Sequence, residues 1–494
     1  MSSYRACRLV SVFFVPYCGY RYNRRVRFIL ASGKREGKEM RRGKFLVAGV
    51  VLALMSLPLS SLASVSEEQA NRLGRDLMPT GGLRAGNAEG TIPEWRGGLE
   101  RREIDLNHPD PLGNPFGDDP MRFRITAENM AQFRDQLTPG HIAMLEAYSD
   151  TYTMPVYPTR RSTSYPDYVY EWTRYNAVNA ELEGRDGLRG AYMGVPFPIP
   201  TRGEHPIWNH KMRYRGEGAR VFNNRAIVNT AGDYFLVRIV QEVLFFYHMQ
   251  DYSPERLDES NEHLRYMEQT VSPSRLAGNV LLVHEPIDQL REQRQAWIYN
   301  PGQRRVRRAP NVEHDNPSAN ADGLLTNDQT DVFNGSLNRY DWELVGRQEF
   351  YMPYNSYRLQ STSLTYDQIL QAGHINQDLA RYELRRVWVV DARVRDGVRH
   401  LFPRRTFYVD EDSWQILSVD IYDNRGQLWR VQEAHNVNFY NAQAVTGILE
   451  ATYDLQSRRY IAVGLGNEDP VSDYRWTESP SYFTPAQLRR GGRR

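Results

Sequence analysis

In this 494-residue chain, the side chains that could bind ligands or catalyse a reaction occur mainly in charged clusters. The most pronounced cluster is basic. Residues 304–308 read Arg-Arg-Val-Arg-Arg. On a strand, Arg305 and Arg307 share one face, while Arg304, Val306 and Arg308 share the other. Two interpretations are open. The cluster is either a solvated sheet edge protected against aggregation or a surface that contacts lipid headgroups or a partner protein.

Candidate metal ligands are few. His205 and His210 lie five residues apart and so do not share a helix face. Residues 315–323 offer carboxylate and amide oxygens but lack the spacing and the terminal Glu of a calcium loop. The acidic run Asp410-Glu411-Asp412 could bind a cation, although its place in a hairpin favours a solvated turn. We therefore predict no metal and no cofactor.

Catalytic motifs are missing from the sequence. There is no G-x-S-x-G, H-E-x-x-H, Walker loop or dinucleotide fingerprint. The Gly-rich stretch from Pro79 up to Pro120 has no following Lys-Ser/Thr and is interpreted as an ordered surface loop, with a nucleotide site as the alternative. We predict no catalytic residues and a protein that is not an enzyme. A hydrolase stays possible, because strands bring distant carboxylates together unseen.

The elements that must position these residues centre on the stretch 381–438. Runs rich in β-branched and aromatic residues alternate there with Asp396-Gly397 and Asn424-Arg425-Gly426, which suit tight hairpins. This pattern predicts a four-stranded antiparallel meander. Further strand patterns run from residue 219 to residue 308 and from 342 to 360, and a last hairpin spans 448–465.

The N-terminal part reads differently. Ser66 to Gln69 forms a capping box, helices are expected after Thr126, at Thr138-Pro139 and over 167–183, and a short helix or turn is expected over 208–214. Alternate prolines make residues 194–200 an extended strap across the surface. Residues 311–338 form a polar loop long enough to be functional. The predicted class is α+β, with helices and irregular segments packed on a large curved antiparallel sheet.

The first residues predict export. A basic run from Met40, an apolar core over 45–59 and Ser61-Leu62-Ala63 have the pattern of a cleaved signal peptide, with Met40 the expected start. A retained anchor is the alternative. Residues after 63 hold 50 basic and 58 acidic residues, a net charge of −8, and no cysteine, since Cys7 and Cys18 both precede them. This acidic composition argues against nucleic acid as a partner. The expected location is the periplasm of a Gram-negative cell.

The sequence patterns divide the chain into four parts. Residues 1–63 are an upstream extension plus signal, 64–215 are helical and loop-rich, 216–470 form the antiparallel half-barrel, and 471–494 are a tail. After residue 63 no apolar run of about 20 residues exists, so no integral membrane span is expected.

Several segments together resemble a known family. They are residues 84–95, 154–161, 194–200, 296–308, 333–335, 405–410 and 421–426. These segments are similar to a periplasmic family of unknown function within the outer-membrane lipoprotein-sorting-like (LolA/LolB) superfamily. The resemblance implies an open half-barrel whose concave face holds acyl chains or another apolar ligand, often alongside RND-type exporters. It carries no catalytic residues.

The leading functional prediction is a carrier for a lipid or other hydrophobic molecule that exchanges it with an envelope transporter. Strand aromatics would line the pocket, and Arg305 and Arg307 would meet headgroups or a partner. The predicted pocket residues are Trp297, Tyr299, Trp388, Trp414 and Trp429. Core packing is the alternative role for each of these aromatics. An assembly factor that docks an outer-membrane partner is the second function, and an unrecognised hydrolase is the third.

Overall fold

The computed structural model describes residues 65–491 except 106–107, 109 and 310–314. The predicted signal peptide and the rest of residues 1–63 therefore lie outside the described residues. Within the described part of the chain, no helix is long and apolar enough to cross a membrane. The boundaries of the four parts stay predictions.

Sixteen strands form one large sheet, which is antiparallel except where β2 meets β13. Its main path runs β1-β2-β13-β14-β15-β16-β17-β18-β6-β7-β8-β9-β10-β11, while β12 pairs with β13 and β5 pairs with β7. The strands are β1 (Phe123–Ile125), β2 (Met154–Val156), β5 (Gly218–Phe222), β6 (Asn224–Val228), β7 (Tyr234–Phe245), β8 (Glu262–Ser272), β9 (Val280–Pro286), β10 (Gln295–Asn300), β11 (Arg305–Arg308), β12 (Tyr340–Pro353), β13 (Tyr382–Val394), β14 (Arg404–Asp410), β15 (Ile416–Tyr422), β16 (Leu428–Phe439), β17 (Ala444–Asp454) and β18 (Arg459–Leu465). A separate hairpin joins β3 (Glu181–Glu183) to β4 (Gly187–Arg189). The prediction of an α+β protein with a large antiparallel sheet is confirmed.

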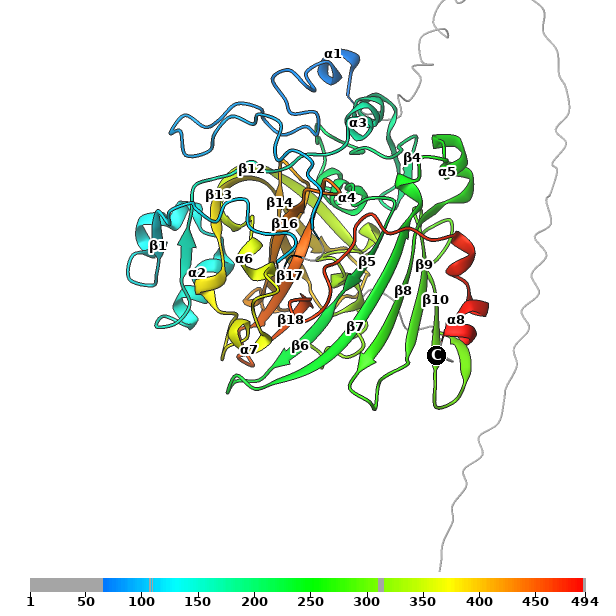
Figure 1. Ribbon diagram of the computed structural model, residues 1–494. Helices are drawn as coiled ribbons and strands as arrows, with labels where there is room; N and C mark the ends of the chain where they lie inside the picture. The colour runs from blue at the N-terminus through cyan, green and yellow to red at the C-terminus, as the bar shows by residue number, and fades with distance from the viewer. Residues whose placement is uncertain (1–64, 106–107, 109, 310–314, 492–494) are drawn as a thin grey trace, which may run out of the picture. The chain divides into compact units, whose positions relative to one another are not determined.

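The predicted meander is present as β13, β14, β15 and β16, each paired antiparallel with the next. One boundary differs. Residues 398–403 are not a strand, and β14 begins only at Arg404. Figure 1 shows these strands beside β17 and β18.

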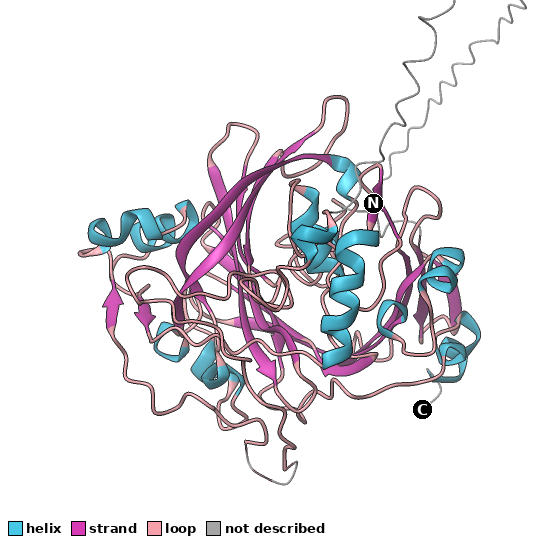
Figure 2. Cartoon of the chain, turned by 90° about the horizontal axis from the view of Figure 1, so that it is seen from above, coloured by secondary structure: helices cyan, strands magenta, loops and turns pink. Residues whose placement is uncertain are grey.

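The helices are short and gather on both sides of the sheet (Figure 2). They are α1 (Glu67–Ala70), η1 (Met130–Gln136), α2 (Pro139–Ala147), α3 (Asp167–Asn179), α4 (Glu204–Met212), η2 (Phe246–His248), α5 (Pro254–Ser260), η3 (Asn327–Gln329), η4 (Leu337–Arg339), α6 (Tyr357–Gln360), α7 (Tyr366–Ile369), η5 (Gln377–Leu379), η6 (Pro480–Tyr482) and α8 (Pro485–Gly491). The capping box of α1 and the Thr138 cap of α2 are confirmed. The helix expected up to Glu183 ends at Asn179, because the chain then enters β3.

Both faces of the central strands are buried. On β14, Phe407 and Val409 pack in the apolar cluster that holds Trp208 of α4, whereas Tyr408 between them packs against Phe350. Packing on both faces explains why these strands are buried at nearly every position instead of at alternate ones.

The proline-rich segment 194–200 is buried, so its prediction as a surface strap is wrong. Its backbone groups find side-chain partners in place of a sheet. The Asn209 amide donates to the Phe197 carbonyl at 2.8 Å and its oxygen accepts from the Phe197 N–H at 2.8 Å, while Thr173 Oγ1 accepts from the Val195 N–H at 2.9 Å. A segment without strand pairing can be buried when its polar groups are satisfied in this way.

The acidic turn Asp410-Glu411-Asp412 is also buried, so its prediction as a solvated turn is wrong. Arginines from distant segments neutralise it. Arg161 donates to Asp412 Oδ1 at 2.6 Å, and Arg385 donates to Asp410 Oδ1 at 2.9 Å and to Asp412 Oδ2 at 2.8 Å. The turn therefore joins the N-terminal segment to the sheet through ion pairs and hydrogen bonds.

Candidate functional site

The candidate site lies where the large sheet divides along β7. The first residues of β7 pair with β6, and residues 240–244 pair with β5 on the same edge. The change occurs at Asn223 and Asn224, beside the point where the pairing of β7 with β8 shifts register between Arg238 and Ile239. The Ile239 N–H donates to Asn224 Oδ1 at 2.8 Å, so this donor is satisfied at the register shift. The strand β18 pairs with β6 as far as Leu465 and Asn224. Beyond that pair, β18 has no pairing with β5.

A cavity of about 160 Å³ occupies this fork. Its walls come from β5, β7 and β8 on one side, β17 and β18 on the other, and the loop 318–334. The apolar wall residues are Ala219, Val221, Phe222, Val243, Phe245, Leu264, Leu325, Phe439, Ile448, Leu449 and Val463. A cavity of this size is similar to one that holds a single aromatic ring in an apolar core.

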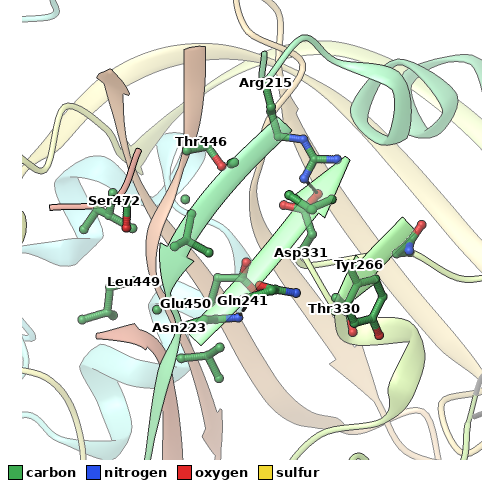
Figure 3. Close-up of a pocket in the computed structure, with 18 of the residues that line it drawn as sticks. Arg215, Asn223, Gln241, Tyr266, Thr330, Asp331, Thr446, Leu449, Glu450 and Ser472 are labelled. Atoms are coloured by element: carbon green, nitrogen blue, oxygen red, sulfur yellow. Dashed lines mark hydrogen bonds and ion pairs between the residues drawn. The ribbon is translucent and has the colours of Figure 1, made fainter. Parts of the chain in front are cut away.

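One end of the cavity is strongly charged. Asp331 accepts two hydrogen bonds from the guanidinium of Arg213, at 2.9 and 2.5 Å, and one from Arg215 at 2.7 Å. Figure 3 shows Arg215 and Asp331 directed toward each other. Lys211 also lines the cavity, with its ammonium 3.2 Å from the Gly335 carbonyl oxygen. Two arginines therefore neutralise the Asp331 carboxylate at this end of the cavity.

The loop at this end has a strained backbone. Asp331 and Val332 both have positive φ, +53° and +62°, and a β-branched residue rarely adopts that conformation. Contacts hold it there, since the Val332 N–H donates to Glu450 Oε2 at 3.1 Å and Asp331 is held by its two arginines. Backbone strain that the surroundings maintain is found preferentially at ligand-binding sites.

The charged groups have shifted pKa values. Burial raises the pKa of Glu450 to about 8, and the neighbouring Asp331 charge adds to the effect. Burial acts to raise the pKa of Asp331 as well, but the charges of Arg213 and Arg215 outweigh it and hold that pKa well below its usual range. Burial lowers the pKa of Arg215 to about 10 and lowers that of Lys211. At neutral pH the site therefore holds a neutral Glu450 beside an ionised Asp331.

The five predicted pocket aromatics all belong to one apolar cluster, but none lines this cavity. Tyr299, Trp388 and Trp414 are buried within the cluster, and Trp297 and Trp429 are half-buried at its edge. The Trp414 indole donates to the Thr80 carbonyl at 2.9 Å, and the Trp429 indole donates to Asp454 at 3.0 Å. Their role in ligand binding stays a prediction.

The other candidates are placed as follows. Arg305 and Arg307 are exposed on β11 and lie opposite Asn300 and Ile298, respectively, of β10. His205 and His210 are buried in α4, and the His210 ring bonds to the Asp331 carbonyl at 2.8 Å and to the Ile416 N–H at 3.1 Å. Among the described residues, no group of three His, Cys, Asp or Glu side chains could hold a metal ion.

Sequence reasoning missed Lys211, Arg213, Arg215 and Glu450 as site residues. The basic residues alternate along 211–215, a pattern that was available but reads as an ordinary polar turn. The long polar loop 311–338 was singled out by its length, and it supplies Asp331. Glu450 lies on a strand with no local signal, and only the tertiary contact with Val332 reveals it.

The fold and the site define a class: α+β proteins that enclose a mixed apolar and charged cavity at a fork in one large sheet. The chain belongs to the DUF1329 family, described as a protein of unknown function, whose family model matches residues 124–489. It is 46% identical over 455 residues to the uncharacterized protein PA3922 of Pseudomonas aeruginosa, covering 92% of this chain and 100% of that protein. The predicted membership of a family of unknown function is confirmed.

Solved structures show a more partial similarity. A DUF1329 family protein from Desulfovibrio piger aligns with a TM-score of 0.38 and 14% identity, over 55% of this chain and 92% of that one. A LolA superfamily protein from Nitrosomonas europaea aligns with a TM-score of 0.35 and 11% identity, over 58% of this chain and 98% of that one.

Proposed function

We propose that the protein is a non-enzymatic carrier that binds a small amphiphile in the cavity at the fork of the sheet. The single observation that supports it is the composition of that cavity, in which an apolar wall leads to one charged end. Apolar walls with a few fixed polar groups are the usual design of a small-molecule site. An acyl chain or ring would lie against Val243, Leu264 and Ile448, and the polar head would face Lys211 and Arg215.

The wider setting is part of the same proposal. The predicted signal peptide supports a carrier that works in the periplasm and exchanges its ligand with an envelope transporter of the RND type or with an outer-membrane protein. In this proposal the sheet acts as an open, LolA/LolB-like half-barrel whose concave side is partly filled by the protein's own N-terminal segment.

The test is ligand retention by cavity variants. Protein purified from the periplasm should carry a small amphiphile visible by native mass spectrometry, and it should take up a short fatty acid such as octanoate, measured by calorimetry. Val243→Trp fills the cavity and should abolish both signals. Val240→Trp is the matched control, because Val240 lies on the same strand without lining the cavity. A bare mass together with no uptake by the unmodified protein would refute the carrier.

A hydrolase is the second candidate, because the cavity brings together two carboxyl groups with opposite pKa shifts. A neutral Glu450 beside an ionised Asp331 has the protonation pattern of a general acid and a base. Both oxygens of Asp331, however, already accept hydrogen bonds from Arg213 and Arg215. Glu450→Gln distinguishes the two functions: a carrier variant keeps its ligand uptake, whereas a hydrolase variant binds its substrate but no longer converts it.

A further inference from the structure

A second, larger cavity lies on the other side of the loop that closes the first one. Its volume is about 700 Å³. It lies among the segment 289–294, the end of β11, the segment 336–339 and the turn after β13. The two cavities share no lining residue, although Asn334 lines the first and Ser336 lines the second. The ligand of the first cavity therefore does not explain the second.

Arginines dominate the lining of the second cavity. Arg294, Arg308, Arg339 and Arg395 come from four separate segments, and Asp186 is the only carboxylate among the described lining residues. Asp186 is itself occupied, because it accepts from the Ser336 hydroxyl and from the Leu337 N–H. The cavity therefore has a clear excess of positive charge.

Among the described residues, three of these arginines have no carboxylate oxygen closer than 3.9 Å. Arg294 is neutralised by Glu285, with one contact at 3.0 Å. Arg395 donates to the side-chain oxygen of Asn338 at 2.6 Å, and its nearest carboxylate, on the exposed Asp341, is 3.9 Å away. Arg339 makes one long hydrogen bond to a backbone carbonyl, at 3.4 Å. For Arg308, which is exposed on β11, the structure shows no ion pair with a described residue.

The cross-strand register explains why Arg308 reaches this cavity. It lies opposite Trp297, and Val306 on the same face of β11 packs against the apolar cluster. Arg307 points to the opposite face, where it lies opposite the exposed Ile298. The basic run of β11 is therefore divided: Arg308 belongs to the cavity, and Arg307 does not line it.

Guanidinium groups present a planar fork of N–H donors that matches the oxygens of phosphate. A phosphate monoester carries close to two negative charges at neutral pH, which suits several arginines gathered from different segments. The volume is within the range of sites for small organic molecules, so the expected ligand is larger than a bare ion. Gln293 and Asn338 offer neutral amides at the same wall.

We propose that this arginine cavity, formed by Arg308, Arg339 and Arg395, is a binding site for a phosphate monoester. The phosphate belongs either to a soluble ester or to the headgroup of a lipid, and both present the same chemistry to the arginines. The site goes beyond the proposed carrier function, because it shares no lining residue with the amphiphile cavity.

The experiment measures two probes with the purified full chain. Glycerol 3-phosphate is titrated by calorimetry, and sedimentation is measured with phosphatidylcholine vesicles with and without phosphatidic acid. Arg308→Glu and Arg339→Glu should each weaken binding by roughly ten-fold or more. Arg307→Glu makes the same change of charge on the opposite face of the same strand, so it should leave binding almost unchanged.

The outcomes separate the two sources of phosphate. Binding of glycerol 3-phosphate that only the cavity variants weaken supports a soluble ester. Binding that requires phosphatidic acid vesicles and is weakened by the same two variants supports a lipid headgroup. The proposal is overturned if neither probe binds, or if Arg307→Glu weakens binding as much as Arg308→Glu. None of these results depends on amphiphile uptake, which Val243→Trp tests separately.

Discussion

Two of the buried clusters of arginines and carboxylates in the described part of the chain differ in what surrounds them. At the turn between β14 and β15, Arg161, Arg385 and Arg386 meet Asp410, Glu411 and Asp412, and the space around them is filled by the N-terminal segment. At the fork of the sheet, Arg213 and Arg215 meet Asp331, and a cavity lies beside them. The first we call the closed cluster and the second the open cluster.

The difference shows that buried charge alone does not mark a site. In the closed cluster each carboxylate has an arginine and the chain packs against all sides, which is a structural arrangement. In the open cluster Glu450 accepts a hydrogen bond from the Val332 N–H, and its side chain lines the cavity. The feature that distinguishes the open cluster is space beside charged groups with shifted pKa values.

The largest expected effect is on the closed cluster. Arg385→Ala leaves Asp410 and Asp412 buried without their shared partner, so the free energy of unfolding should fall by about 3–5 kcal/mol. Arg393→Ala on the same strand is the control, because its side chain is 60% exposed and the loss should be about 0–1 kcal/mol. Urea unfolding measures both. Equal losses would remove the distinction between the buried cluster and an exposed pair.

A smaller effect is expected where the N-terminal segment meets the turn. Trp414 has a φ of +61°, a conformation it keeps while its indole N–H donates to the Thr80 carbonyl. Trp414→Phe removes this hydrogen bond and part of the packing, so it should cost about 2 kcal/mol of unfolding free energy. Trp429→Phe, at a half-buried position, should cost less in the same thermal or urea unfolding measurement. The reverse order would contradict our assignment of the closed cluster.

The open cluster should respond to pH. Burial raises the pKa of Glu450 from 4.5 to about 8, so the folded protein holds a proton that the unfolded chain releases. The stability from this group is fully present below pH 4.5 and is lost as pH rises through about 8. Glu450→Gln should remove this loss and be more stable than the unmodified protein by on the order of 1–2 kcal/mol at higher pH. Urea unfolding at several pH values measures both proteins. If the free energy of unfolding of the unmodified protein and of Glu450→Gln changed with pH in the same way, the raised pKa of Glu450 would be contradicted.

The smallest effect is expected in the cavity wall. Val243→Ala removes methyl groups that already face empty space, so the free energy of unfolding should change by less than about 1 kcal/mol. Val390→Ala, fully buried in β13, should cost about 2 kcal/mol or more. Differential scanning calorimetry compares the two. A large loss at Val243 would show that the cavity wall is ordinary core.

The sequence determined the local elements well where the signal was local. The hairpin turns Asp396-Gly397 and Asn424-Arg425-Gly426 and the Ser66 capping box are short-range patterns, so the meander and α1 could be predicted from them. The family, too, could be recognised from its segments before the structure was considered. The end of α3 was missed, because β3 and β4 pair there in a way that propensity does not encode.

Only the tertiary structure decided the candidate site. The acidic turn at residues 410–412 and the proline-rich segment 194–200 look solvated in sequence, yet arginines and side-chain amides from distant positions satisfy their polar groups and bury them. In the same way Glu450 and Asp331 are separated by more than a hundred residues and meet only where β7 divides. Burial and pKa depend on which distant groups surround a residue, and that is settled by packing of the whole chain.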